Sequence, residues 1–215
     1  TPQYNLNGEV LPPILGEPPA DAHKYTRGSV LCFSGPRHRT GAIRLSAKAA
    51  LRMGAGAVTI VGDAAALNDH AAHCNAVMLR EEAEWTPRVT AALFGPAAGV
   101  GAATREGVLA VLAQHIGTVL DADALTSFAT APDDLFAALH DKAVLTPHAG
   151  EFVRLFPDIP LDDPAMAARM AEVGFDYVGV SLDGIGATHD RVRRLAGGFD
   201  QAVAGIRLAR DAGLK

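Results

Sequence analysis

The chain has 215 residues, of which 49% are hydrophobic and 20% are charged. This length and composition allow one sizeable buried core and are typical of a globular protein. Lys and Arg number 19 against 24 Asp and Glu, so the chain lacks the basic excess that drives binding to phosphate backbones, and we expect no nucleic-acid partner.

The cysteine pattern and the hydropathy bear on the compartment. Cys32 and Cys74 fit no zinc or iron–sulfur motif, and a reducing cytoplasm is the simplest compartment for the protein. No apolar stretch approaches the roughly 20 residues needed to span a bilayer, so we expect no membrane partner. Residues 1–22 are rich in proline, which is typical of a linker between domains. A homo-oligomer is compatible with the sequence but not specified by it.

A strand–helix–strand unit is predicted first along the chain. Residues 30–33 form a short apolar run, and the turn-rich segment 34–41 leads into residues 42–53, whose apolar positions recur at helical spacing. The β-branched run 57–61 supplies a second strand. A helix between two strands joins them in parallel.

The rest of the chain to residue 158 repeats this alternation. The further short apolar runs predicted as strands are residues 75–79, 91–94, 118–120 and 143–145, and helical patterns cover residues 103–114 and 132–140. We therefore predict an α/β fold with a doubly wound, mostly parallel sheet. Ligands of such sheets bind beyond the carboxyl ends of the strands, so the segments expected to hold the site are 34–41, 95–101, 121–125 and 146–151.

Two of these segments are glycine-bearing loops. Segment 34–41 precedes a helix N-terminus, which favours an anion such as a phosphate, and Arg37 and Arg39 add positive charge. It matches neither a dinucleotide-binding nor a P-loop motif, and a plain strand-to-helix turn explains it equally well. Segment 95–101 permits close backbone approach to a dinucleotide, although a structural turn is somewhat favoured.

The other two segments carry titratable side chains. Asp121 and Asp123 end an apolar run, where carboxylates are costly unless they meet a cation, hydrogen-bond donors or solvent. A site role for at least one is favoured, and the alternative is a helix N-cap. His148 has the chemistry to hydrogen-bond a ligand amide or hydroxyl, but a cap on a neighbouring carbonyl is the favoured interpretation.

Five motifs occur in a fixed order: residues 23–28 (HKYTRG), 41–45 (GAIRL), 51–56 (LRMGAG), 120–125 (LDADAL) and 145–152 (LTPHAGEF). Together they resemble the ribokinase-like domain of the ADP/ATP-dependent NAD(P)H-hydrate dehydratases, which return hydrated nicotinamide cofactors to NAD(P)H. The resemblance covers residues 23–158. It implies a three-layer fold and a hydro-lyase that uses ADP or ATP with Mg²⁺ to dehydrate the S epimer of NAD(P)HX, a small-molecule dinucleotide.

The resemblance also implies site residues. Ala42, Gly99 and His148 would contact the hydrated dinucleotide. Asp121 and Asp123 are kept beside them as candidate polar or metal-adjacent groups. No resident metal site is assigned.

The chain departs from this family in two places. Ala97 stands where the family usually has glycine. After residue 158 the family continues with a Lys-Gly segment and a Gly-Ser/Thr-Gly-Asp loop whose Asp acts in the chemistry, and neither occurs here. The later segments 183–186 and 196–198 lack that order, and we expect no suitable helix after them. No catalytic residue is assigned, the fold is expected to be truncated, and the activity is predicted to be impaired.

The C-terminal tail resembles a different family. Residues 174–184 (GFDYVGVSLDG), 188–190 (THD) and 205–208 (GIRL) resemble a segment of the radical SAM enzymes of haem biosynthesis. They predict a strand over 177–182 and a helix over 199–212, a β/α appendage that either docks on the sheet edge or stays apart. The tail contains no cysteine, so we expect no iron–sulfur cluster, and radical chemistry is the least favoured function.

The expected organisation is a linker over 1–22, a dehydratase-like domain over 23–158 and a tail over 159–215. The alternative to a repair enzyme is a non-catalytic chain, either a dinucleotide-binding remnant or a chimera.

Overall fold

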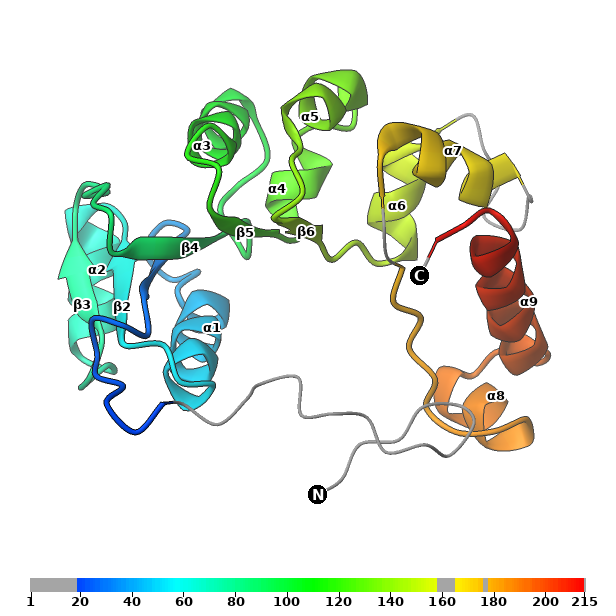
Figure 1. The fold of residues 1–215 in the computed structure, drawn as a ribbon, viewed down its shortest axis with the longest axis horizontal. Helices are drawn as coiled ribbons and strands as arrows, with labels where there is room; N and C mark the ends of the chain where they lie inside the picture. Colours follow the sequence, from blue (N-terminus) through cyan, green and yellow to red (C-terminus); the bar gives the residue numbers. More distant parts are fainter. Residues whose placement is uncertain (1–18, 158–164, 176–177, 215) are drawn as a thin grey trace. The chain divides into compact units, whose positions relative to one another are not determined.

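A computed structural model describes residues 19–157, 165–175 and 178–214 (Figure 1). The chain forms two compact units, Thr1–Leu93 and Phe94–Lys215. Each unit is described by itself.

The first unit is a parallel βαβ arrangement. Its elements are β1 (Ser29–Phe33), α1 (Gly41–Arg52), β2 (Ala57–Val61), α2 (Ala64–Ala71), β3 (Met78–Arg80) and all but the last residue of β4 (Val89–Phe94). β1 pairs in parallel with both β2 and β4, and β2 pairs in parallel with β3. The predicted strand–helix–strand unit is confirmed.

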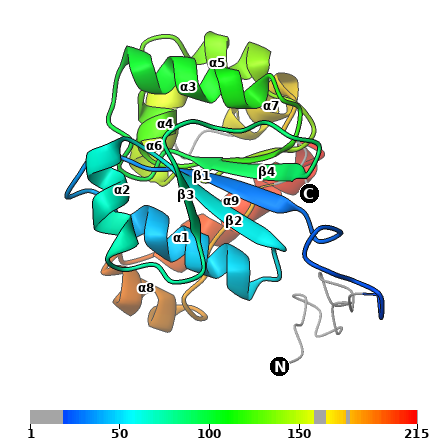
Figure 2. The ribbon, with the colours of Figure 1, turned by 90° about the vertical axis from the view of Figure 1, so that its left-hand side faces the viewer.

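The core of this unit lies between α1 and the strands that it packs along, β1 and β2 (Figure 2). Ile43 and Ala47, four residues apart and therefore on one face of α1, are completely buried. They pack with Cys32, Val58 and Ile60. Burial raises the pKa of the Cys32 thiol to about 12, so this cysteine serves packing and not thiolate chemistry.

The second unit carries two strands and seven helices among its described residues. They are α3 (Ala102–Leu112), β5 (Gly117–Leu120), α4 (Asp123–Thr126), α5 (Pro132–Ala138), β6 (Ala143–Leu145), α6 (Ala149–Leu155), α7 (Ala165–Val173), α8 (Ala187–Arg193) and α9 (Gly198–Asp211). β5 and β6 pair in parallel. Leu120, Leu125 and Phe128 are fully buried in its core.

In the first unit the strand order is β3-β2-β1-β4, and in the second unit β5 lies beside β6. Parallel strands joined by helices confirm the predicted α/β class. β3 lies slightly later than the predicted run 75–79, because residues 73 and 74 still hydrogen-bond the carbonyl of His70 at the end of α2.

The tail differs from its prediction. Residues 178–182 are not in a strand, although a strand was predicted over 177–182; residue 177 itself lies outside the described residues. α9 confirms the predicted helix over 199–212. Met170 and Leu214 are buried in the same core cluster as Leu155 and Phe156. The described part of the tail therefore packs into the second unit through helices, not as a β/α pair.

Helices do follow the tail's glycine segments, where no suitable helix was expected. Gly186 and Gly197 directly precede α8 and α9. The Asp190 carboxylate accepts hydrogen bonds from the Gly197 and Phe199 amides, at 2.7 and 2.8 Å. These bonds satisfy the start of α9 and, with the Phe199 amide as the largest cause, hold the pKa of Asp190 below its ordinary value. The Gly-Ser/Thr-Gly-Asp order is still not present in the sequence.

Candidate functional site

The loop between β4 and α3 begins at a glycine that no other residue can replace without rearrangement. Gly95 has φ +128°, and a Cβ atom added there would lie 1.7 Å from the carbonyl oxygen of Asp121. The amide of Asp121 donates in turn to the carbonyl of Phe94, at 3.1 Å. The backbone after β5 therefore lies directly against the start of this loop.

Asp123 holds the middle of the same loop. Its Oδ2 accepts a hydrogen bond of 2.8 Å from the Gly99 amide, and Thr104 Oγ1 donates to the Gly99 carbonyl. Ser127 Oγ accepts from the Gly101 amide at 3.1 Å and donates to the Asp123 carbonyl at 2.6 Å. The glycine loop is thus fixed by a carboxylate and a hydroxyl one helical turn apart.

The two aspartates have different partners, and neither is a helix N-cap. α4 starts at Asp123, and the residue before it, Ala122, makes no side-chain cap. Asp121 Oδ1 accepts a hydrogen bond of 2.7 Å from Thr146 Oγ1, just beyond β6. The hydrogen-bond donors that the sequence analysis required for these carboxylates are therefore present.

His148 caps α6 through amides and not through a carbonyl. Its Nδ1 accepts from the amides of Gly150 and Glu151, at 3.0 and 3.3 Å. Glu151 Oε2 accepts from the His148 amide at 3.0 Å, which completes a capping box. The His148 Nε2 atom lies 3.2 Å from Glu151 Oε1, and the imidazole is 69% exposed. The ring is held in one orientation while it stays open to a ligand.

Ala42 belongs to the first unit. It is the second residue of α1 and is exposed. Thr40 occupies the N-cap position of α1, but its side chain does not cap the helix. Its Oγ1 accepts instead from Arg44 Nη1, at 2.8 Å. The other four predicted residues (Gly99, Asp121, Asp123 and His148) belong to the second unit.

Sequence reasoning missed two residues that fix the glycine loop, Ser127 and Thr104. Ser127 carried a signal, because it lies four residues after Asp123 and so one turn along a helix. Thr146, which holds Asp121, lies in the segment 146–151 that was expected at the site, but it was given no role of its own. Within the described ranges, no group of three or more His, Cys, Asp or Glu side chains is placed to hold a metal ion.

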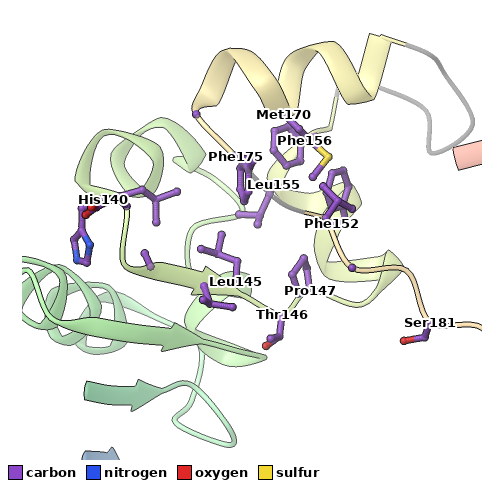
Figure 3. Close-up of a pocket in the computed structure, with 17 residues that line it drawn as sticks. His140, Leu145, Thr146, Pro147, Phe152, Leu155, Phe156, Met170, Phe175 and Ser181 are labelled. Atoms are coloured by element: carbon purple, nitrogen blue, oxygen red, sulfur yellow. The ribbon is translucent and has the colours of Figure 1, made fainter. Parts of the chain in front are cut away.

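A cavity of about 640 Å³ lies beside β6 (Figure 3). Its wall is mostly apolar and includes Leu145, Phe152, Phe156, Met170 and Phe175. The lining combines residues of α6 and α7 with Val178, Gly179 and Ser181, and it includes none of the predicted site residues. The cavity therefore reflects the packing of the tail onto the second unit.

Comparison with known proteins assigns the family. The model of the family described as NAD(P)H-hydrate dehydratase matches residues 30–178. The chain belongs to the NAD(P)H-hydrate dehydratase family. It is 30% identical to the ADP-dependent (S)-NAD(P)H-hydrate dehydratase of Enterococcus faecalis over 171 residues, which cover 75% of this chain and 58% of the relative. The chain therefore spans less than two thirds of that relative's length.

The fold agrees with the family. The chain superposes on the crystal structure of the ADP/ATP-dependent NAD(P)H-hydrate dehydratase from Bacillus subtilis, co-crystallised with ATP and Mg²⁺, with a TM-score of 0.62 at 22% identity. The alignment covers 94% of this chain and 78% of that one. The predicted ribokinase-like fold is confirmed.

The C-terminal segment has a second relative. A stretch of 49 residues is 55% identical to the pre-heme d1 synthase of Dinoroseobacter shibae and covers 23% of this chain but 12% of that protein. The resemblance of the tail to haem-biosynthesis enzymes is confirmed. No helix within the described residues is both long and apolar enough to cross a membrane.

Proposed function

We propose that this chain binds hydrated NAD(P)H through Ala42, Gly99 and His148 and retains the substrate side of an ADP/ATP-dependent (S)-NAD(P)H-hydrate dehydratase. The observation that carries the proposal is the glycine loop 95–101, pinned at Gly99 by Asp123 in a chain of this family. A glycine backbone held at a strand end allows close approach of a dinucleotide without interfering side chains.

The proposed role of each group follows from its contacts. Asp123 orients the Gly99 segment by taking up its amide, so this aspartate positions the loop and does not touch the substrate. His148, fixed by Glu151 and exposed, offers its ring to the dinucleotide. The described acidic groups form no cation cage, so Mg²⁺ would arrive with the phosphates of ADP or ATP, as a part of that co-substrate.

Turnover by the chain as given is proposed to be weak. Between residue 158 and residue 215 it has no Gly-Ser/Thr-Gly-Asp order, the loop that the family resemblance assigns to phosphate binding and chemistry. Loss of anion-binding amides removes stabilisation of the transferring phosphoryl group. We further propose the cytoplasm as the compartment, and the division into a linker, a dehydratase-like domain and a tail at residues 22 and 158.

The test follows NADH absorbance while the purified chain is incubated with NADHX, Mg²⁺ and either ADP or ATP, with the E. faecalis enzyme as the reference. We expect NADH binding by the chain but turnover far below the reference. Turnover at the reference rate would refute the impairment, and failure to bind both NADHX and its product NADH would refute the proposal as a whole.

Two variants sharpen the binding measurement. Asp123→Ala removes the group that holds the Gly99 amide and is expected to weaken NADH binding by about tenfold, as for the loss of one hydrogen bond to a charged group. Asp134→Ala is the matched control, because Asp134 is an exposed aspartate of α5 in the same unit. Equal NADH affinities of Asp123→Ala and Asp134→Ala would refute the role of Asp123 in positioning the glycine loop.

A second candidate function is a non-catalytic dinucleotide-binding chain, favoured by the resemblance of the C-terminal segment to haem-biosynthesis enzymes. Binding of NADH with no turnover under either nucleotide would support it. Radical SAM chemistry is the third and weakest candidate, because the tail contains no cysteine. A cluster absorbance after reconstitution with iron and sulfide would revive it.

A further inference from the structure

Two adjacent residues of α2, Asp69 and His70, contact the loop that leads from β1 to α1. Neither was singled out by the sequence patterns. His70 is completely buried, and its Nε2 lies 2.8 Å from Ser34 Oγ, the first residue after β1. The Ser34 amide donates to the carbonyl of Val61 at 2.7 Å, so this serine is anchored by its backbone as well.

The hydrogen bonds of Ser34 define the direction of the contact with His70. Ser34 Oγ donates its proton to the carbonyl of Gly35, at 2.8 Å. It therefore accepts from the imidazole, which must carry its proton on Nε2. The Nδ1 atom of His70 is buried and has no hydrogen-bond partner in the part of the chain that the structure describes.

Asp69 holds the same loop four residues further along. Its Oδ2 accepts from the His38 amide at 3.1 Å, and its Oδ1 lies 3.5 Å from Arg37 Nε. The His38 amide is the largest of the influences that lower the pKa of the Asp69 carboxyl. His38 has φ +68°, a left-handed conformation that a residue with a side chain keeps only when its surroundings hold it.

We infer that Asp69 and His70 are positioning residues. Through their contacts with Ser34, Arg37 and His38, here called the clamp, they fix the loop before α1 in the conformation that presents Ala42 to the dinucleotide. The ligand assigned to this loop rests on the proposed function. The clamp itself rests only on contacts within the first unit. Because Ser34 and His38 are both held by adjacent residues of α2, a displacement of α2 is expected to move the loop that leads into α1.

The variants are chosen to separate the clamp from general packing. His70→Ala and Ser34→Ala each remove the same hydrogen bond, so their effects are expected not to add in the double variant. His70→Gln keeps an N–H donor near the position of Nε2, so its amide exchange and its NADH affinity are expected to lie closer to those of the unaltered chain than to those of His70→Ala. Asn68→Ala is the matched control, an exposed side chain on the same helix.

The first measurement needs no ligand. Amide hydrogen exchange over residues 34–40 is expected to be about tenfold faster in His70→Ala and Ser34→Ala than in the unaltered chain or in Asn68→Ala, as for the loss of one hydrogen bond. Unchanged exchange in both variants would overturn the clamp. If His70→Ala fails to fold, Ser34→Ala and His70→Gln decide the question.

The second measurement is the Kd for NADH. It is expected to rise about tenfold in His70→Ala and Ser34→Ala and to recover in His70→Gln. Faster exchange with unchanged NADH affinity would overturn the positioning role and leave a purely structural contact. Failure of the unaltered chain to bind both NADHX and NADH would overturn the proposed function and the ligand assigned here, while the exchange rates would still decide whether the pair holds the loop.

Discussion

Ala97 adopts a left-handed backbone conformation, with φ +60°, in the loop that carries Gly99. For a residue with a Cβ atom this conformation costs roughly 1–2 kcal/mol relative to the right-handed region. Ala97→Gly removes that cost but adds about 0.5–1 kcal/mol of chain entropy to the unfolded state. The net expectation is a gain of about 0.5–1 kcal/mol in the free energy of unfolding.

Urea denaturation of the unaltered chain, Ala97→Gly and Ala110→Gly tests this reasoning. Ala110 is exposed within α3, in the same unit, where glycine is expected to cost about 1 kcal/mol. The two alanine-to-glycine changes should therefore act in opposite directions. A loss of stability in Ala97→Gly as large as that in Ala110→Gly would show that the left-handed conformation of Ala97 carries no strain.

Three further predictions concern stability. Gly95→Ala is expected to cost at least about 3 kcal/mol, because the new Cβ would lie 1.7 Å from the Asp121 carbonyl oxygen. Gly99→Ala is the comparison: its Cβ meets open space, so it should cost only the roughly 1–2 kcal/mol of a left-handed backbone. Equal losses of stability in urea denaturation would contradict the steric argument. Burial is the largest cause that lowers the pKa of His70 from its ordinary value of 6.5, so the unfolded chain binds the proton first and stability is expected to fall as the pH drops below about 6.5. His70→Asn, which does not titrate, should flatten that dependence between pH 7.5 and 5, and an unaltered slope would exclude His70 as its source. Asp63→Ala removes the N-cap that accepts from the Ala66 amide at 2.8 Å and is expected to cost about 1 kcal/mol, measured by thermal or urea unfolding; no change would show that α2 does not depend on this cap.

Local patterns predicted most elements because they report burial and turns within a few residues. β6 was predicted at its observed bounds, since an apolar run there meets polar turns on both sides. α2 was missed because only Ala66 and His70 of its eight residues are buried, which leaves no apolar stripe to recognise. The strand over 177–182 was wrong because strand formation needs a partner, and sequence pattern alone does not supply one.

The candidate site was predicted as a set of residue types at strand ends and not as a set of contacts. Asp121 and Asp123 stood out because carboxylates are costly at the end of a buried strand. Their partners, Thr146 and the Gly99 amide, lie 25 and 24 residues away along the chain and are brought close only by the fold. His148 was expected to cap a carbonyl, whereas the helix that follows it offers free amides.

The helical structure of the tail bears on how an α/β domain can accommodate an added segment. A helix closes its own backbone hydrogen bonds, so a host domain has only to offer apolar side chains against which one stripe can rest, as the cluster around Phe156 does for Met170 and Leu214. A strand would have required a matching edge and a register. An α/β domain can therefore accommodate an added segment more readily where that segment folds as helices than where it must join the sheet.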